Sequence, residues 1–242
     1  AQKAHYQYER LYRNLYNPQL YLLAYQNLYA NKGSTTAGAD GATLSGMSLK
    51  RIESLIKKLR DRSYQPHPAR RQYIPKKSGN GLRPLGIPAA DDKLVQEAVR
   101  MILESIYEPT FQSTSHGFRP GKSCHTALSQ IQKTFTGVSW FVEGDIKGCF
   151  DNIDHHILVN ILKRRIKDEA FIDLIWKLLR AGSLSAMVIN SGAAHWRRLA
   201  TIMGSLHPAS ASSSGSLCRL PAPVMHSGLR QGSTRASRPK QA

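Results

Sequence analysis

The sequence predicts a helix-rich α+β body followed by a long basic tail. Apolar residues recur at helical spacing along most of the first 180 residues, an Asn-Gly pair lies between two short extended segments, and sustained periodicity ends at Gly182. We therefore divide the chain into a helical N-terminal extension (1–62), a mixed segment (63–182) and a low-complexity tail (183–242). The tail is rich in Ser, Gly, Ala, Pro and Arg, and we expect it to be disordered.

Two helices, or one broken helix, are expected within residues 6–30. Tyrosine and leucine recur there at helical spacing, and Asn17-Pro18 interrupts the pattern. The tyrosines could stack on bases, but this spacing more often forms an amphipathic face with the hydroxyls at its rim. A glycine-rich loop (31–41) follows, and residues 48–62 return to a helical period with a basic outer face.

A basic hairpin is expected next, because Arg71–Ile74 and Leu82–Ile87 flank the sequence Ser-Gly-Asn-Gly. Five cations and no acid occur on or beside it, which favours phosphate binding over a merely solubilising edge. These cations are Arg70, Arg71, Lys76, Lys77 and Arg83.

Three further helices are expected in the mixed segment. Asp91 and Asp92 precede an apolar stripe that ends at Pro109, and we interpret them as helix caps rather than metal ligands. Residues 154–165 and 168–180 also have helical periodicity.

A stretch at residues 116–128, HGFRPGKSCHTAL, is expected to be a loop that runs into a helix. His116, Arg119, Lys122 and His125 supply hydrogen-bond donors there. The two histidines are too weakly patterned to be zinc ligands, and a satisfied loop histidine is the better interpretation of each.

The acidic stretch Phe141–Ile157, FVEGDIKGCFDNIDHHI, begins as a strand that alternates faces and ends at a turn. Asp145 lies at the end of the strand, Asp151 follows, and Asp154 has the position of a helix N-cap. Protein carboxylates together with substrate phosphates commonly hold Mg²⁺. The spacing alone leaves open whether Asp145 and Asp151 are metal ligands or ordinary turn residues.

The net charge of +18, from 34 Lys and Arg against 16 Asp and Glu, favours a polyanionic partner. An acidic membrane surface would attract this positive charge as well, but there is no run of about twenty apolar residues and no signal peptide. Nucleic acid is the expected partner, without membrane association. The three cysteines, Cys124, Cys149 and Cys218, form no CxxC pair, and we expect a reducing compartment in a bacterial cytoplasm or an organelle rather than secretion.

Four stretches in this order resemble the reverse transcriptases of group II introns, the maturase family. They are NKGSTTAGADG (31–41), GLRPLGIP (81–88), HGFRPGKSCHTAL (116–128) and EGDIKGCFDNIDH (143–155), and the resemblance covers residues 5–182. It implies a right-hand polymerase with fingers and part of a palm. It also implies RNA as template or intron partner, a DNA primer, deoxynucleoside triphosphates as substrates and Mg²⁺ as cofactor.

The resemblance also implies roles for individual residues. Asp145 and the carbonyl of Ile146 would bind metal, and Asp151 would be a second acid that need not touch it. The incoming nucleotide would be bound by Lys76, Arg83 and Phe150, the ring of Phe150 packing under the sugar and disfavouring a 2′-hydroxyl. Template and primer would be contacted by His116, Arg119 and Lys122.

The chain departs from the family pattern after the helix that ends near Arg180. A PQG-type loop and a Tyr-x-Asp-Asp turn do not follow, and residues 183–242 contain no aspartate. We therefore expect a truncated or degenerate polymerase copy that is inactive by itself, with a tail outside the family reading frame. The alternative is a non-catalytic, maturase-like fragment that binds RNA. A metal nuclease using Asp145, Asp151 and Asp154 is disfavoured, because the segment lacks the set of a histidine and further acids that such sites usually show.

Overall fold

A computed structural model of the chain describes residues 6–31, 33–76, 81–140, 144 and 153–182. The elements follow in the order η1 (Tyr12–Tyr16), α1 (Pro18–Tyr29), η2 (Leu44–Gly46), α2 (Leu49–Arg60), β1 (Arg70–Pro75), β2 (Leu82–Ile87), α3 (Ala90–Tyr107), η3 (Glu108–Thr110), α4 (Cys124–Thr134), α5 (His155–Lys163) and α6 (Glu169–Arg180). Apart from Gly144, the expected strand at 141–146 lies outside the described residues, and so does the expected disordered tail at 183–242.

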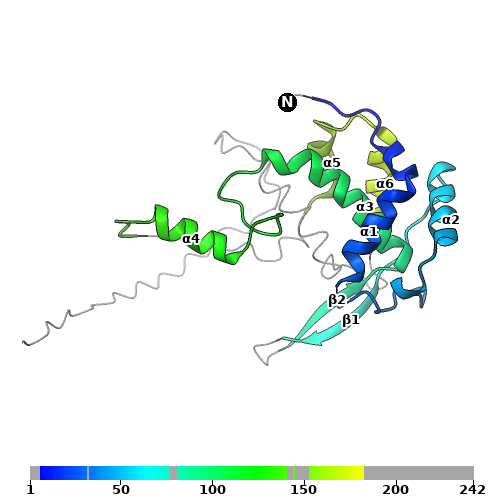
Figure 1. The fold of residues 1–242 in the computed structure, drawn as a ribbon, viewed down its shortest axis with the longest axis horizontal. Helices are drawn as coiled ribbons and strands as arrows, with labels where there is room; N and C mark the ends of the chain where they lie inside the picture. The colour runs from blue at the N-terminus through cyan, green and yellow to red at the C-terminus, as the bar shows by residue number, and fades with distance from the viewer. Residues whose placement is uncertain (1–5, 32, 77–80, 141–143, 145–152, 183–242) are drawn as a thin grey trace, which may run out of the picture.

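Five helices form the body, and the hairpin β1–β2 extends from one end of it (Figure 1). The cyan-green hairpin projects below α1 and α2 toward the lower left of the view, and α4 lies at the left, apart from the other helices. The described part of the chain is thus helix-rich with one two-stranded antiparallel sheet, which confirms the expected α+β class. The assignment of its parts to the fingers and palm of a polymerase remains a proposal.

The break in the first helical segment is confirmed at Asn17-Pro18. The side chain of Asn17 caps α1 by accepting a hydrogen bond from Gln19 N at 3.0 Å, and Pro18 occupies the first helical position, where no backbone donor is needed. Ser48 caps α2 through a hydrogen bond from Arg51 N. Local sequence signals therefore define both helix starts.

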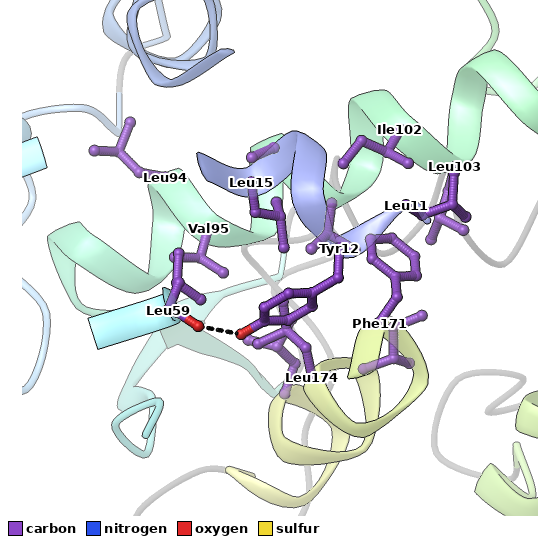
Figure 2. Packing of buried hydrophobic residues seen from close by; sticks show 14 of the residues in the cluster. Leu11, Tyr12, Leu15, Leu59, Leu94, Val95, Ile102, Leu103, Phe171 and Leu174 are labelled. Carbon is purple, nitrogen blue, oxygen red and sulfur yellow. Dashed lines mark hydrogen bonds between the residues drawn. The ribbon is translucent and has the colours of Figure 1, made fainter. Parts of the chain in front are cut away.

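The expectation that tyrosine hydroxyls lie at the rim is wrong for two of the tyrosines. Tyr12 and Tyr21 are buried, and their hydroxyls donate to the backbone carbonyls of Leu59 and Leu15 at 2.8 and 2.9 Å. Figure 2 shows the first of these bonds inside the packed cluster. Burial raises the pKa of Tyr12 to about 12 and raises the pKa of Tyr21 further. A phenol with a hydrogen-bond partner can be fully buried, so helical spacing alone does not place it at a rim.

The helix α3 is the centre of the body. Twelve of its 18 residues are buried, among them the ion pair of Glu97 and Arg100. The Arg100 guanidinium contacts Glu97 and Glu104 at 2.7 Å each, and Asn27 of α1 donates to Glu97 at 3.0 Å. These contacts satisfy the charged groups that α3 buries against α1.

The interpretation of Asp91 and Asp92 as caps is wrong. The cap position of α3 is held by Ala89, whose side chain cannot cap. Asp91 instead pairs with Arg51 of α2 at 2.6 Å, and buried Asp92 accepts hydrogen bonds from Tyr64 Oη at 2.6 Å and from a backbone amide. Both acids lie in the first turn, so they still meet the positive end of the helix dipole, but their partners are tertiary.

The N-terminal segment joins the body at the turn between α5 and α6. Tyr8 forms a parallel bridge with Ile166, with two backbone hydrogen bonds of 2.8 Å. Asp168, the N-cap of α6, accepts hydrogen bonds from Phe171 N and from Tyr12 N at 2.8 Å. Residues of the first 62 positions thus share one core with α3, α5 and α6.

Candidate nucleic-acid and nucleotide interface

The expected hairpin is confirmed, with antiparallel register from Arg70 opposite Ile87 to Pro75 opposite Leu82. The Lys76 amide donates to Gly81 O at 3.1 Å and extends the pairing by one step. The four residues of the connecting turn, 77–80, lie outside the described residues.

Lys76 is exposed at the outer end of β1. The backbone of Arg83 lies in β2 opposite Ile74, and its side chain is outside the described part. Tyr73 and Leu82 nearby are more than half exposed, at 53% and 58%. The outer half of the hairpin therefore presents a cation and apolar surface to solvent, and these can meet a phosphate and a sugar or base.

The inner end of the hairpin is attached to the body. The Arg70 guanidinium donates through Nε and Nη2 to Ala37 O at 3.2 and 3.0 Å, and Ala69 N donates to Gly182 O at 3.1 Å. Arg70, although exposed, is thus engaged with the glycine-rich loop through two hydrogen bonds. The even distribution of basic residues along the sequence gave no sign that Arg70 has a partner in the glycine-rich loop.

His116 and Arg119 direct their polar atoms into the protein. The ring nitrogens of His116 contact Thr126 Oγ1 at 2.8 Å and Gln130 Oε1 at 2.5 Å, as the interpretation of a satisfied loop histidine requires. Arg119 donates to Glu108 Oε1 at 2.9 Å and to two backbone carbonyls, and its side chain is only 11% exposed. Its guanidinium also lies 4.9 Å from the ring centre of Phe111.

Lys122 is exposed at the tip of the same loop. Ser123 follows it as the N-cap of α4 and forms a capping box with Thr126, which confirms the expected loop-to-helix transition. Within this loop His116 and Arg119 determine the shape, and Lys122 is the cation that faces solvent.

Asp145, Ile146, Phe150 and Asp151 lie outside the described residues, so their predicted roles stay predictions. In the described ranges no three or more His, Cys, Asp or Glu side chains come together as a metal site would require. The described residues therefore do not by themselves form a Mg²⁺ centre. Asp154 is described, and it caps α5 by accepting hydrogen bonds from the amides of His156 and Ile157.

Sequence reasoning missed Lys93, which donates through Nζ to the carbonyls of Thr36 at 2.8 Å and Gly33 at 3.4 Å. A lysine beside two buried helical positions, Asp92 and Leu94, is a weak signal that such a side chain has a partner. Its carbonyl partners, 57 and 60 positions away in the sequence, had no pattern that could reveal them.

Comparison with known proteins defines the class of the molecule. The family model for reverse transcriptase (RNA-dependent DNA polymerase) matches residues 74–203, which is more than half of the 242 residues. The chain belongs to this family, and within it to the group II intron reverse transcriptases and maturases. The match begins in β1 and continues beyond residue 182 into the segment expected to be a tail.

The relatives come from bacteria and mitochondria. The group II intron-encoded protein LtrA of Lactococcus lactis subsp. cremoris is 56% identical over 177 residues, covering 73% of this chain and 30% of LtrA. An uncharacterized 91 kDa protein in a cob intron of Schizosaccharomyces pombe is 49% identical over 178 residues, covering 72% of this chain and 22% of that protein. Nuclear intron maturase 1 of Arabidopsis thaliana, mitochondrial, is 39% identical over 93 residues, covering 38% of this chain and 13% of the maturase. The chain thus spans less than a third of the length of these relatives.

Proposed function

We propose that this chain is the fingers and the beginning of the palm of an RNA-directed DNA polymerase encoded by a group II intron. The observation that carries the proposal is the hairpin β1–β2. Its outer end and β2 lie in the segment matched by the reverse transcriptase family, which begins at residue 74. The inner end of the hairpin is attached to the helical body, and the outer end presents exposed Lys76. A fixed base with an exposed cation suits a group that grips the triphosphate of an incoming nucleotide.

In this proposal Lys76 and Arg83 bind the triphosphate, and Phe150 excludes a 2′-hydroxyl beneath the sugar. Template and primer phosphates meet the loop at residues 116–123. His116 and Arg119 hold this loop in shape through the contacts described above, and Lys122 provides its exposed charge. RNA template, DNA primer and deoxynucleoside triphosphates are thus the proposed partners.

The carboxylate of Asp145 and the carbonyl of Ile146 are the proposed Mg²⁺ ligands. Oxygen donors of this kind suit Mg²⁺, which keeps several of its sites for water and phosphate. When bound, two such ions would stabilise charge on the attacking and leaving oxygens of an in-line displacement.

A second candidate function is RNA binding without catalysis. It is favoured by the composition of the segment after Asp173, which contains no Asp or Glu at all, whereas the family places further metal-binding aspartates beyond this point. The basic excess of +18 would still support binding to RNA. None of the helices in the described residues is long and apolar enough to cross a membrane.

Primer extension on an RNA template with Mg²⁺ separates the two functions. The wild-type chain is compared with Asp145→Ala, with Lys76→Gln and with Lys58→Gln, which removes one exposed charge from α2 as a matched control. RNA binding is titrated in parallel between about 50 and 200 mM salt, where six or more phosphate contacts would weaken binding by roughly a thousandfold.

We expect steep salt dependence and no extension for this 242-residue chain, with RNA affinity unchanged by Asp145→Ala. Extension that Asp145→Ala abolishes would instead assign the complete polymerase activity to these residues. RNA affinity that is weak and independent of salt would contradict both functions.

A further inference from the structure

The glycine-rich loop, described from residue 33 to 41, and the residues that follow it up to Met47 are folded and partly buried. The two sides of this stretch are joined by a hydrogen bond from Leu44 N to Ser34 O at 3.2 Å, and both of these residues are buried. Asp40 accepts a hydrogen bond from Ala42 N at 3.2 Å inside the loop. This stretch therefore has a defined conformation and a defined place against the body.

The loop backbone is pressed against the junction between β2 and α3. A Cβ atom added to Gly38 would lie 2.5 Å from Ala89 Cα and 2.5 Å from Pro88 O. Real Cβ atoms do not approach backbone atoms so closely, so only glycine fits there unless the two segments separate. Pro88 directly follows the last residue of β2, which places the loop at the inner end of the hairpin.

Two cations hold the loop carbonyls from two different elements. Lys93, in the first turn of α3, donates to Thr36 O and Gly33 O, and Arg70, the first residue of β1, donates twice to Ala37 O. The loop, the hairpin base and the start of α3 thus form one hydrogen-bonded unit.

The charges around this unit are nearly balanced. Burial lowers the pKa of Lys93, the nearby Arg70 lowers it further, and Asp40 opposes both effects. Arg51 of α2 lies between Asp40 and Asp91, at 3.6 and 2.6 Å. Placing a half-buried ammonium beside a guanidinium costs free energy, and the carbonyl hydrogen bonds and Asp40 offset that cost.

We propose that Lys93 and Arg70 are positioning residues, which lock the loop at 33–41 onto the hairpin base and so set where the hairpin presents Lys76. An isolated two-stranded hairpin is marginally stable in water, and the outer half of this one is exposed. Its orientation therefore depends on how its base is held. The consequence for nucleotide binding rests on the proposed function, whereas the locking itself does not.

Hydrogen exchange of the 242-residue chain tests the locking. We expect Lys93→Gln, Arg70→Gln and their combination to speed exchange of the amides in β1 and β2 by about tenfold or more, with Lys58→Gln unchanged. Arg70→Lys keeps a donor and should recover part of the protection. The melting temperature should change little, since none of these variants removes core packing.

Gly38→Ala tests the same contact without changing any charge. The added methyl group should separate the loop from the junction and speed hairpin exchange as Lys93→Gln does. Gly46→Ala is the matched control, because a Cβ at Gly46 meets nothing within 4 Å. Hairpin exchange in Lys93→Gln and Gly38→Ala equal to that of the two controls would overturn the inference.

Nucleotide binding then connects the locking to function. Affinity for Mg²⁺-bound dATP should fall about fivefold or more in the Lys93→Gln, Arg70→Gln double variant, and Lys58→Gln should match the wild type. If the variants exchange faster but the wild-type chain binds no nucleotide, the locking stands and the triphosphate role of the hairpin is refuted. Faster exchange with unchanged affinity would refute the positioning of Lys76 by the loop.

Discussion

The helices α3 and α4 have similar local sequence signals and very different surroundings. Both are amphipathic, and α4 has the better start, because Ser123 caps it whereas α3 has no side-chain cap. Yet α3 buries twelve of its 18 residues and α4 buries none of its 11. Local signals therefore determine where a helix forms, and the rest of the fold determines how much of the helix is buried.

We refer to residues 111–140 as the α4 arm. Six of its large apolar side chains are 45% to 82% exposed, and they are Phe118, Leu128, Ile131, Phe135, Val138 and Trp140. The contacts of His116 with Thr126 and Gln130 lie within the arm. Its described ties to the body include the ion pair of Arg119 with Glu108 and the packing of Phe111 against the edge of the core cluster. The body, in contrast, is held by a continuous apolar cluster (Figure 2). Removing apolar groups should therefore affect the body strongly and the arm weakly.

The largest effect is expected for a matched pair of phenylalanines. Phe171→Ala removes a ring that is 0% exposed and should lower the free energy of unfolding by about 3–5 kcal/mol. Phe135→Ala removes a ring that is 52% exposed and should change it by about 0.5 kcal/mol or less. Urea denaturation measures both, and equal losses would show that the arm is packed as tightly as the body.

Asp168 should give the next largest effect. Its carboxylate caps α6 and also accepts the buried amide of Tyr12, so Asp168→Ala leaves two backbone donors without this acceptor. We expect a loss of about 1–3 kcal/mol, measured by urea denaturation. Asp168→Asn keeps one carbonyl acceptor and should lose less. A wild-type midpoint for Asp168→Ala would mean that the junction between the N-terminal segment and α6 does not stabilise the body.

Asp92 makes the stability of the body depend on pH. Burial raises its pKa above the usual 3.8, against the opposing hydrogen bonds from Tyr64 and His67. At a pH between 3.8 and this raised pKa, Asp92 holds a proton in the folded chain that it has lost in the unfolded chain. The contribution of Asp92 to the free energy of unfolding is therefore full below pH 3.8 and declines as the pH rises through the raised pKa. The slope is at most about 1.4 kcal/mol per pH unit.

Asp92→Asn should remove this decline from a plot of unfolding free energy against pH. The amide retains one carbonyl acceptor for the Tyr64 hydroxyl, so the variant is expected to fold. A plot whose acid region has the same slope in the variant as in the wild type would assign the pH dependence to other groups.

The comparison of α3 with α4 also explains how far sequence reasoning reached. The cap at Asp154 was predicted because a capping side chain acts on an amide within three positions. Asn17, Ser48 and Asp168 act over the same short range, so the same local rule applies to them. The hairpin was predicted for the same reason, because its turn chemistry is local.

Partners distant in the sequence could not be predicted. The acids Asp91 and Asp92 have the local pattern of caps. In the structure, however, Asp91 pairs with Arg51, 40 positions away, and Asp92 accepts a hydrogen bond from Tyr64, 28 positions away. For the candidate site, the basic pattern predicted a cationic hairpin but not that Arg70, which is exposed like Lys76, donates to a carbonyl 33 positions away. The spacing singled out Asp145 but left its role open. Its predicted role in metal binding and the role of Phe150 came from the family resemblance, and their geometry stays a prediction.

The smallest global effect is expected in the α4 arm itself. Ser123→Ala removes the side-chain acceptor for Thr126 N at 3.3 Å, which should destabilise α4 locally by about 1 kcal/mol. Because α4 buries no residue, the local loss should not reach the body. Amides of α4 should then exchange about fivefold faster, while those of α3 and the urea midpoint stay at wild-type values. Ser123→Thr, which keeps the hydroxyl, is the control. Faster exchange in α3 as well would show that the arm and the body unfold as one unit. The two helices would then differ in how much they bury but not in their local stability.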